Sequence, residues 1–320
     1  MPLISLVVPV FNEEESVAIY VQTTRGVLEA GNLDFEIVFV NDGSRDGTLP
    51  RLMELAEEDK RVRIINLSRN FGKEIALTAG IDHAAGDVLV PMDVDLQDPP
   101  ELIPKFLERW REGYDVVYGV RTSRKYDNLI KRATSGAFYR IFNRLSHLQI
   151  PENAGDFRLF DRRVADVIRQ IPERNRFMKG LFAWVGFNSV GVPYERPRRA
   201  AGNTKWGNWK LWNFALDGLI SFSTLPLRVW AYIGGIVAIL SFFYGSFIVI
   251  RVLTQGIDIP GYASLLTVVL FLGGLQLLSI GVLGEYLGRL FIEVKGRPLY
   301  VVASTYPPAS PQRAAVNHTD

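Results

Sequence analysis

The chain has 320 residues, a formal net charge of +2 and no cysteine. The lack of cysteine excludes disulfide bonds and thiolate metal sites, and a net charge so close to zero argues against nucleic acid as a partner. The three histidines, His83, His147 and His318, are too scattered for a zinc site built on histidine. The length allows one large domain or two ordinary ones.

Up to about residue 120, short apolar runs alternate with helix-like segments. The apolar runs predict buried strands at Ile4–Val10, Phe35–Val40, Val62–Leu67, Val88–Met92 and Asp115–Gly119. The segments between them predict helices at Ser16–Ala30, Thr48–Asp59, Lys73–Ala84 and Pro100–Glu112. This alternation indicates an α/β fold with a mostly parallel sheet. The N-terminus lacks the basic segment and the cleavage site of a signal peptide, so we expect a domain made in the cytoplasm.

Polar residues follow every predicted strand, at the edge where open α/β sheets bind ligands. In chain order they include Asn12, Glu14, Asp42, Lys73, Asp93, Asp95, Gln97 and Arg121. Because the carboxyl ends of parallel strands meet at one edge, we expect these side chains to converge on one site. The residues that we expect to close a nucleoside pocket there are Pro9, Asn12, Glu14 and Asp42.

The sequence Asp93-Val94-Asp95, at the end of the fourth predicted strand, indicates a metal site. Two carboxylates this close repel each other, and a cation relieves the repulsion. Mg²⁺ takes one or two carboxylates as ligands and accepts phosphate oxygens as others. Lys73 opens a predicted helix, where backbone N–H groups and the ammonium both attract phosphate. This edge of the sheet is therefore predicted to bind a metal and a diphosphate.

Two uncharged runs, Val229–Ile250 and Ala263–Gly284, dominate the last third of the chain. Each is long enough to cross about 30 Å of hydrocarbon as a helix. We therefore expect two transmembrane helices, at about 229–251 and 263–286. The preceding segment, 208–227, predicts an amphipathic helix that lies at the membrane surface or packs on the α/β domain. The expected parts are the α/β domain (1–207), the amphipathic helix (208–227), the hairpin (228–290) and a C-terminal tail (291–320).

Positive charges flank the hairpin at its two open ends. Arg228 precedes the hairpin, and Arg289, Lys295 and Arg297 follow it, whereas the turn carries Arg251 and Asp258. The positive-inside rule therefore places the α/β domain and both termini in the cytoplasm. The composition of residues 303–320, rich in Pro, Ala, Ser and Thr, is typical of a disordered tail.

Four segments carry a family resemblance: Val8–Glu14, Val40–Ser44, Arg69–Lys73 and Asp93–Pro100. Together they resemble the GT-A glycosyltransferases of the dolichol-phosphate mannosyltransferase type. With the two predicted spans, the chain is most similar to the bacterial bactoprenol (undecaprenyl phosphate) glucosyltransferases. The resemblance implies a GT-A (Rossmann-like) domain at the bacterial inner membrane and an inverting transfer from a UDP-sugar to undecaprenyl phosphate. It also implies Mg²⁺ or Mn²⁺ as cofactor and a homotetramer.

The same resemblance assigns roles to individual residues. The donor-binding positions are Pro9, Asn12, Glu14, Asp42, Lys73 and Asp93, and the metal ligands are Asp93, Asp95 and Gln97. Asp156 matches the catalytic acidic residue, and Asp95 acts with it. The expected ligands of the acceptor phosphate are Arg121, Arg132, Ser135, Arg158 and Lys205. Because the acceptor phosphate is already anionic, little proton removal is required. Asp156 could therefore act as a positioning group as well as a base, and both roles stay open.

Two other functions fit parts of the sequence. A processive polysaccharide synthase would carry a Gln-x-x-Arg-Trp motif and more spans, and Gln170–Arg174 does not match that motif. A membrane scaffold with a nucleotide-binding domain would have disrupted acidic positions, whereas all of them are filled here. Glucose is the sugar that the resemblance favours, and galactose, N-acetylglucosamine, mannose and a modified pentose stay open.

Overall fold

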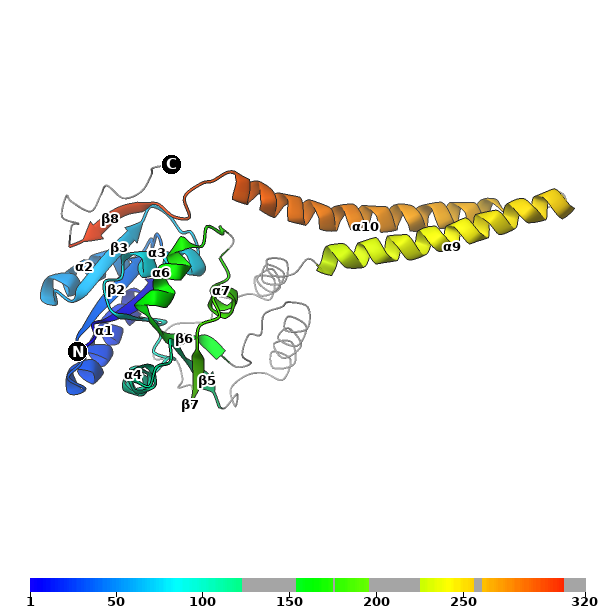
Figure 1. The fold of residues 1–320 in the computed structure, drawn as a ribbon. Coiled ribbons are helices and arrows are strands. Elements are labelled where there is room, and N and C mark those ends of the chain that lie inside the picture. The colour runs from blue at the N-terminus through cyan, green and yellow to red at the C-terminus, as the bar shows by residue number, and fades with distance from the viewer. Residues whose placement is uncertain (123–153, 175, 196–224, 256–260, 308–320) are drawn as a thin grey trace.

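The computed structural model describes residues 1–122, 154–174, 176–195, 225–255 and 261–307 (Figure 1). The strands of this part of the chain are β1 (Ile4–Val10), β2 (Phe35–Asn41), β3 (Val62–Leu67), β4 (Val88–Pro91), β5 (Val116–Arg121), β6 (Ala154–Asp161), β7 (Ser189–Tyr194) and β8 (Val302–Tyr306). The helices are α1 (Glu14–Ala30), α2 (Thr48–Glu58), α3 (Lys73–His83), α4 (Ile103–Arg111), α6 (Arg162–Gln170), α7 (Met178–Trp184), α9 (Leu225–Gln255) and α10 (Tyr262–Val294), with a 3₁₀ turn, η1 (Pro100–Leu102), before α4. The five strands and four helices predicted for the first part of the chain are confirmed, with ends that differ by a few residues.

The described strands form one eight-stranded sheet in the order β7-β5-β6-β4-β1-β2-β3-β8. β1 pairs in parallel with β2 and β4, β2 with β3, and β5 with β7. β6 runs antiparallel to β4 and β5, and β8 runs antiparallel to β3. The predicted α/β fold with a mostly parallel sheet is therefore confirmed, and two reversed strands make the sheet mixed.

Helices cover both faces of the sheet and give the domain three layers (Figure 1). Ile4, Leu6 and Val8 of β1 belong to one apolar core with side chains of α1, α2 and α4. Val7, which lies between them, packs in a second core with side chains of α3, α6 and α7. Side chains alternate between the faces of a strand, and burial on both faces explains why the parallel strands read as continuous apolar runs.

The packing of α3 fixes the height of its first residue, Lys73, above the edge of the sheet. A Cβ atom added to Gly80 would collide with the side chain of Val7 and approach that of Val40 to 3.0 Å. Glycine at this position therefore lets α3 lie close against β1 and β2. The N-terminus of α3 then stands at the carboxyl ends of these strands.

Strand β8 is the main departure from the sequence prediction. Val302–Tyr306 pairs with β3 at the edge of the sheet, so the predicted disorder of residues 303–320 is wrong for Ala303–Tyr306. Asn66 Nδ2 of β3 donates to Ser304 Oγ at 3.2 Å, across 238 residues of sequence. Composition missed this strand because its stability comes from a partner that is remote in the sequence.

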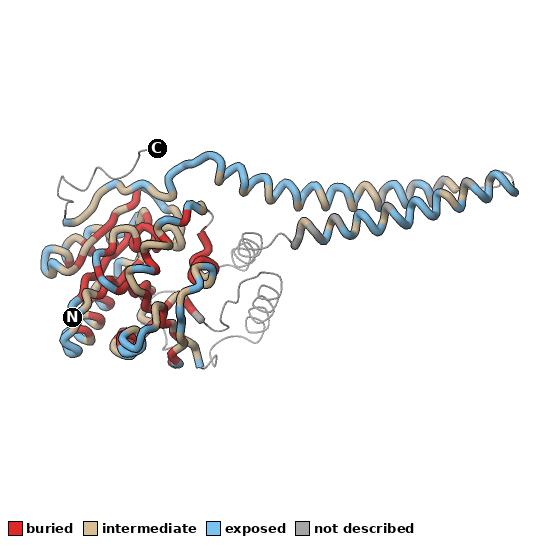
Figure 2. Tube along the Cα trace, in the orientation of Figure 1, coloured by how far each residue is buried: buried red, intermediate tan, exposed pale blue. Residues whose placement is uncertain are grey.

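Helices α9 and α10 lie side by side as a hairpin that projects from the α/β domain (Figure 1). The two predicted helices are thus present, and large apolar side chains on them are exposed, such as Tyr232, Phe242 and Leu277. Figure 2 shows much of the hairpin surface as exposed. In the parts of the chain that the structure describes, no helix is both long and apolar enough to cross a membrane. The predicted amphipathic helix, 208–227, lies outside the described residues up to position 224.

The end of α10 is tied to the α/β domain. Arg174 N donates to Glu293 Oε1 at 2.7 Å, and Arg174 Nε donates to the carbonyl of Arg297 at 2.8 Å. Tyr300 Oη donates to Asp82 Oδ2 of α3 at 2.8 Å. These bonds and β8 join the exit of the hairpin to the helix that begins with Lys73.

Candidate active site

The loops after β1 and β2 are joined by hydrogen bonds. Asn12 N donates to Ser44 Oγ at 2.9 Å, and Asn12 Oδ1 accepts from Arg45 N at 2.8 Å. Glu14 Oε2 accepts from Gly47 N at 3.0 Å. Asn12 has a φ of 54°, in the left-handed region that asparagine adopts more readily than most residues. Two predicted donor-binding residues, Asn12 and Glu14, therefore shape this pair of loops.

Asp42 holds the loop that leads into α3. Its two carboxylate oxygens accept from Phe71 N at 2.7 Å and from Gly72 N at 2.9 Å. Burial raises the pKa of Asp42, although these N–H donors and Arg69 partly oppose the shift. The adjacent Gly43 has a φ of 67°, and a Cβ atom there would collide with the backbone of Arg69. The Asn-Asp-Gly turn therefore allows the two loops to meet.

A cavity of about 610 Å³ opens beside these loops. It is lined by Phe11, Asn12, Asn41, Gly43, Ser44, Arg45, Leu49, Asn66, Leu67, Ser68, Arg69, Asn70 and Ala303. An aromatic ring, amides, hydroxyls and two arginines together suit a nucleoside. Asn12 is the predicted donor-binding residue in this lining, whereas Pro9 lies within β1 in register with Val40. Ala303 of β8 adds a wall that the sequence did not predict.

Lys73 links two carboxylates that are far apart in the sequence. Its Nζ lies 2.6 Å from Asp93 Oδ1 and 3.3 Å from Asp156 Oδ2. Burial by itself would lower the pKa of the Lys73 ammonium, but the charges of Asp93 and Asp156 raise it above its ordinary value. Lys73 is therefore a persistent cation at the carboxyl edge of the sheet.

Asp156 reaches this edge because β6 runs opposite to its neighbours β4 and β5. The first residues of a reversed strand lie where its parallel neighbours end. Asp156 stands near the beginning of β6 (Ala154–Asp161), so it meets Asp93, which follows β4. The direction of one strand thus unites the predicted catalytic residue with the predicted donor site.

Cations surround Asp156 on both of its oxygens. Lys73 lies near Oδ2, and Lys179 Nζ of α7 lies 3.8 Å from Oδ1. Burial by itself would raise the pKa of Asp156, but Lys179, Lys73 and Arg158 lower it well below its ordinary value. A carboxylate stabilised in this way is a weak base. Its arrangement suits a positioning role and not proton removal.

Arg158 is buried and bound to the backbone of its own strand. Its Nη2 donates to the carbonyl of Gly155 at 2.9 Å and its Nε to the carbonyl of Asp156 at 3.4 Å. Its guanidinium lies 4.1 Å from the ring centre of Phe182 in α7. Arg158 therefore supports the backbone that carries Asp156, and its binding to the acceptor phosphate stays a prediction.

The predicted metal ligands lie on the loop after β4. Asp93 is paired with Lys73, and Asp95 Oδ1 accepts from Gln97 N at 3.1 Å. Leu96, with a φ of 55°, turns the loop sharply. Among the described residues, no three His, Cys, Asp or Glu side chains are grouped closely enough to hold a metal by themselves. Asp93, Asp95 and Gln97 offer hard oxygen donors, so they fit Mg²⁺ or Mn²⁺ with further ligands from a substrate.

Arg121, at the end of β5, faces the same site. Its Nε donates to Tyr194 Oη at 3.3 Å, and Tyr194 Oη donates to Asp98 Oδ1 at 3.2 Å. A Cβ atom on Gly155 would lie 2.9 Å from Arg121 Nη2, so the Arg121 guanidinium lies beside the residue that precedes Asp156. The other predicted acceptor ligands, Arg132, Ser135 and Lys205, lie outside the described residues.

Glu74 and Lys179 belong to the site although neither is among the residues that the sequence predicts for it. Glu74 Oε2 accepts from Met178 N at 3.0 Å, which joins the start of α3 to the start of α7. Burial and the charge of Asp156 raise the pKa of Glu74 to about 7. Glu74 had one signal in the sequence, its place next to Lys73. Lys179 had none, because α7 carries no recognisable motif.

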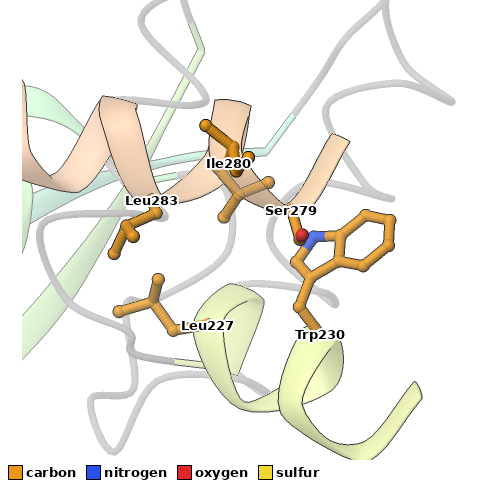
Figure 3. A pocket seen from close by; sticks show the side chains of 6 residues that line it. Leu227, Trp230, Ser279, Ile280 and Leu283 are labelled. Atoms are coloured by element: carbon orange, nitrogen blue, oxygen red, sulfur yellow. The ribbon is translucent and has the colours of Figure 1, made fainter. Parts of the chain in front are cut away.

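A second cavity, of about 300 Å³, lies between α9 and α10. It is lined by Leu227, Trp230, Ser279, Ile280, Val282 and Leu283. Figure 3 shows Leu227 and Trp230 of α9 facing Leu283, Ile280 and Ser279 of α10. The lining is mostly apolar and holds no charged side chain, so it suits a hydrocarbon chain and not charge-dependent catalysis.

The three-layered α/β domain, with a cavity of about 610 Å³ beside a cluster of lysines and carboxylates, has an arrangement that suits a nucleotide substrate. Residues 5–169 match the family model "Glycosyl transferase family 2", and residues 225–290 match "GtrB C-terminal hairpin". The chain therefore belongs to glycosyl transferase family 2. Its mixed sheet is the GT-A-like fold that the resemblance implied.

Known relatives match almost the whole chain. The SfII prophage-derived bactoprenol glucosyl transferase of Shigella flexneri is 52% identical over 95% of this chain and 98% of its own. The prophage bactoprenol glucosyl transferase homolog of Escherichia coli (strain K12) is 51% identical over 93% of this chain and 98% of its own. Glucosyl-3-phosphoglycerate synthase from Mycobacterium tuberculosis, solved with Mn²⁺ and UDP-glucose, is 20% identical with a TM-score of 0.43 over 67% of this chain and 76% of that one. That last likeness is too weak to support an inference.

Glu74 is expected to make the stability of the fold depend on pH. Its pKa rises from 4.5 to about 7 on folding, so the stability that its protonated form contributes is lost as the pH rises from about 4.5 through about 7. Glu74→Gln keeps an acceptor for Met178 N and removes the titration. Between about pH 5 and about pH 8, the free energy of unfolding by urea should fall more in the wild type than in Glu74→Gln.

The exposed Glu57 of α2 provides the control for this measurement. Glu57→Gln should follow the wild type at both pH values. If Glu74→Gln also follows the wild type, Glu74 does not titrate in this range and the prediction is wrong.

Proposed function

We propose that the protein transfers a sugar, expected to be glucose, from a UDP-sugar to a polyprenyl phosphate, expected to be undecaprenyl phosphate. The observation that carries the proposal is the pairing of Lys73 with both Asp93 and Asp156. It brings the predicted donor and metal residues within one charge network of the predicted catalytic residue. The relatives named bactoprenol glucosyl transferase support the choice of substrates.

The UDP-sugar donor fits two neighbouring regions at the carboxyl edge of the sheet, which are the cavity beside the loops after β1 and β2 and the charge cluster around Lys73. The cavity that contains Asn12 and Arg69 takes the nucleoside, and the diphosphate extends toward Lys73. Asp93, Asp95 and Gln97 would hold Mg²⁺ or Mn²⁺ beside it. When bound, such an ion supplies positive charge to a leaving diphosphate. Lys73 adds a second positive charge from the protein itself.

The transfer is a direct displacement at the anomeric carbon. An oxygen of the acceptor phosphate forms a bond to that carbon while the bond from the carbon to the diphosphate breaks, and UDP leaves with the electron pair. Attack from the face opposite the diphosphate inverts the configuration. Because the acceptor oxygen is already anionic, no base is required, and Asp156 holds Lys73 and Lys179 in position. Fixing both substrates side by side supplies much of the rate enhancement.

The hairpin of α9 and α10 is proposed to enter the bacterial inner membrane, with the α/β domain and both termini in the cytoplasm. The exposed apolar side chains of the two helices support this. So does the uncharged run Val229–Ile250 in the full sequence, which includes side chains that the structure does not describe. The homotetramer implied by the resemblance stays a prediction.

Asp156→Asn keeps the size of the side chain and removes the charge that holds the two lysines. Transfer of labelled glucose from UDP-glucose to undecaprenyl phosphate, measured as label in the organic phase, should fall at least about 100-fold. Glu57→Gln should retain wild-type transfer. Wild-type turnover in Asp156→Asn would contradict the assignment.

The same assay separates the alternatives for the wild type. Label in a polymer would indicate a processive synthase, and no transfer from any nucleotide sugar of a panel would indicate a scaffold. Transfer of another sugar from that panel would replace glucose as the assigned donor sugar. The assignment of the acceptor would be unchanged.

Removal of divalent metal is expected to stop the reaction. EDTA should abolish transfer, and excess Mg²⁺ or Mn²⁺ should restore it, because the carboxylates of the loop after β4 would bind the ion together with the diphosphate. Asp95→Asn should need a higher metal concentration for half-maximal activity. Full activity of the wild type in EDTA would refute metal dependence.

Membrane insertion is tested by alkaline carbonate extraction of membranes from expressing cells. The full chain should stay in the pellet, because apolar helices buried in lipid are not released by high pH. A variant without residues 225–290 is the comparison. Release of the full chain into the supernatant would rule out insertion.

A further inference from the structure

In the proposed transfer, the side chain of Lys179 contacts Asp156 and has no contact with a substrate assigned to it. Its Nζ lies 3.8 Å from Asp156 Oδ1, which is an ion pair at a distance beyond that of a hydrogen bond. Its side chain is 22% exposed, so it is held near the site and still open to it. Among the described residues, Asp156 is the carboxylate within ion-pair distance of this ammonium.

The helix that carries Lys179 is fixed in place on several sides. Glu74 Oε2 accepts from Met178 N at 3.0 Å, at the residue before Lys179. Met178 and Leu181 are buried in the core formed with α3 and α6, and Phe182 packs against the Arg158 guanidinium. Lys179 is therefore presented by a rigid support and not by a loose surface helix.

The two lysines contact different oxygens of the Asp156 carboxylate. Lys73 contacts Oδ2 and is itself bound to Asp93 at 2.6 Å, on the side of the predicted metal loop. Lys179 contacts Oδ1 and lacks a second carboxylate among the described residues within ion-pair distance. An incoming phosphate thus meets in Lys179 a cation with less compensating negative charge than Lys73 has.

We infer that Lys179 binds an oxygen of a substrate phosphate, and that this phosphate is the acceptor's. The inference rests on the proposed function. An ammonium is a natural phosphate ligand. Among the described residues Asp93 is ion-paired with Lys73 and Lys179 with Asp156, which favours the acceptor monophosphate over the donor diphosphate as the ligand of Lys179. Asp156 is then the residue that holds Lys179 ready before the acceptor arrives, and Glu74 positions it through Met178.

The test measures the kinetics of purified full-length protein with each substrate varied in turn. Lys179→Ala should raise the KM for undecaprenyl phosphate about 10-fold or more, as expected for the loss of one charged hydrogen bond, and leave the KM for UDP-glucose within about 2-fold. Lys179→Arg should recover most of the affinity because it keeps the charge. Lys105→Ala, at an exposed position of α4, should match the wild type. A merely structural role would instead lower kcat with both substrates.

Lys179→Met, which keeps most of the apolar stem, replaces Lys179→Ala if the latter fails to fold. An active wild type with unchanged KM values in the folded variant would overturn this inference and leave the proposed function intact. A rise in the KM for UDP-glucose alone would support phosphate binding and overturn the acceptor assignment. An inactive wild type would refute the proposed function itself, and this inference with it.

Discussion

The site depends on one interaction, the contact of the Lys73 ammonium with the carboxylates of Asp93 and Asp156. Two carboxylates that share one ammonium would repel each other without that cation between them. The lysine offsets that repulsion and, in the proposed function, also places a positive charge beside the leaving diphosphate. In the proposed function each carboxylate then serves a different substrate, Asp93 on the donor side and Asp156 on the acceptor side.

The packing of the rest of the domain restricts the positions of the Lys73 ammonium and the Asp93 and Asp156 carboxylates. Gly80 lets α3 pack tightly on β1 and β2, which sets the position of Lys73. Asp42 holds the loop before α3 through two backbone N–H groups. Rigid support of this kind matters because a misplaced charge loses most of its effect on a transition state.

The C-terminal segments connect this site to the hairpin. Strand β8 lines the nucleoside-sized cavity with Ala303 and pairs with β3, and Tyr300 is bonded to Asp82 of α3. The chain therefore leaves the α/β domain, passes through the hairpin and returns to complete the sheet. The end of α10 is thereby bonded to the α/β domain that carries the site.

The sequence by itself determined the strands and helices up to Arg121, because parallel strands buried on both faces give continuous apolar runs that local pattern reveals. It also selected Lys73 and Asp93 and, through the family resemblance, Asp156. Only the tertiary structure decided that Asp156 faces Lys73, since strand direction in a mixed sheet is set by pairing and not by local composition. The same holds for β8, whose partner is remote in the sequence, and for Lys179 and Glu74, whose significance arises from the packing of α7 against α3.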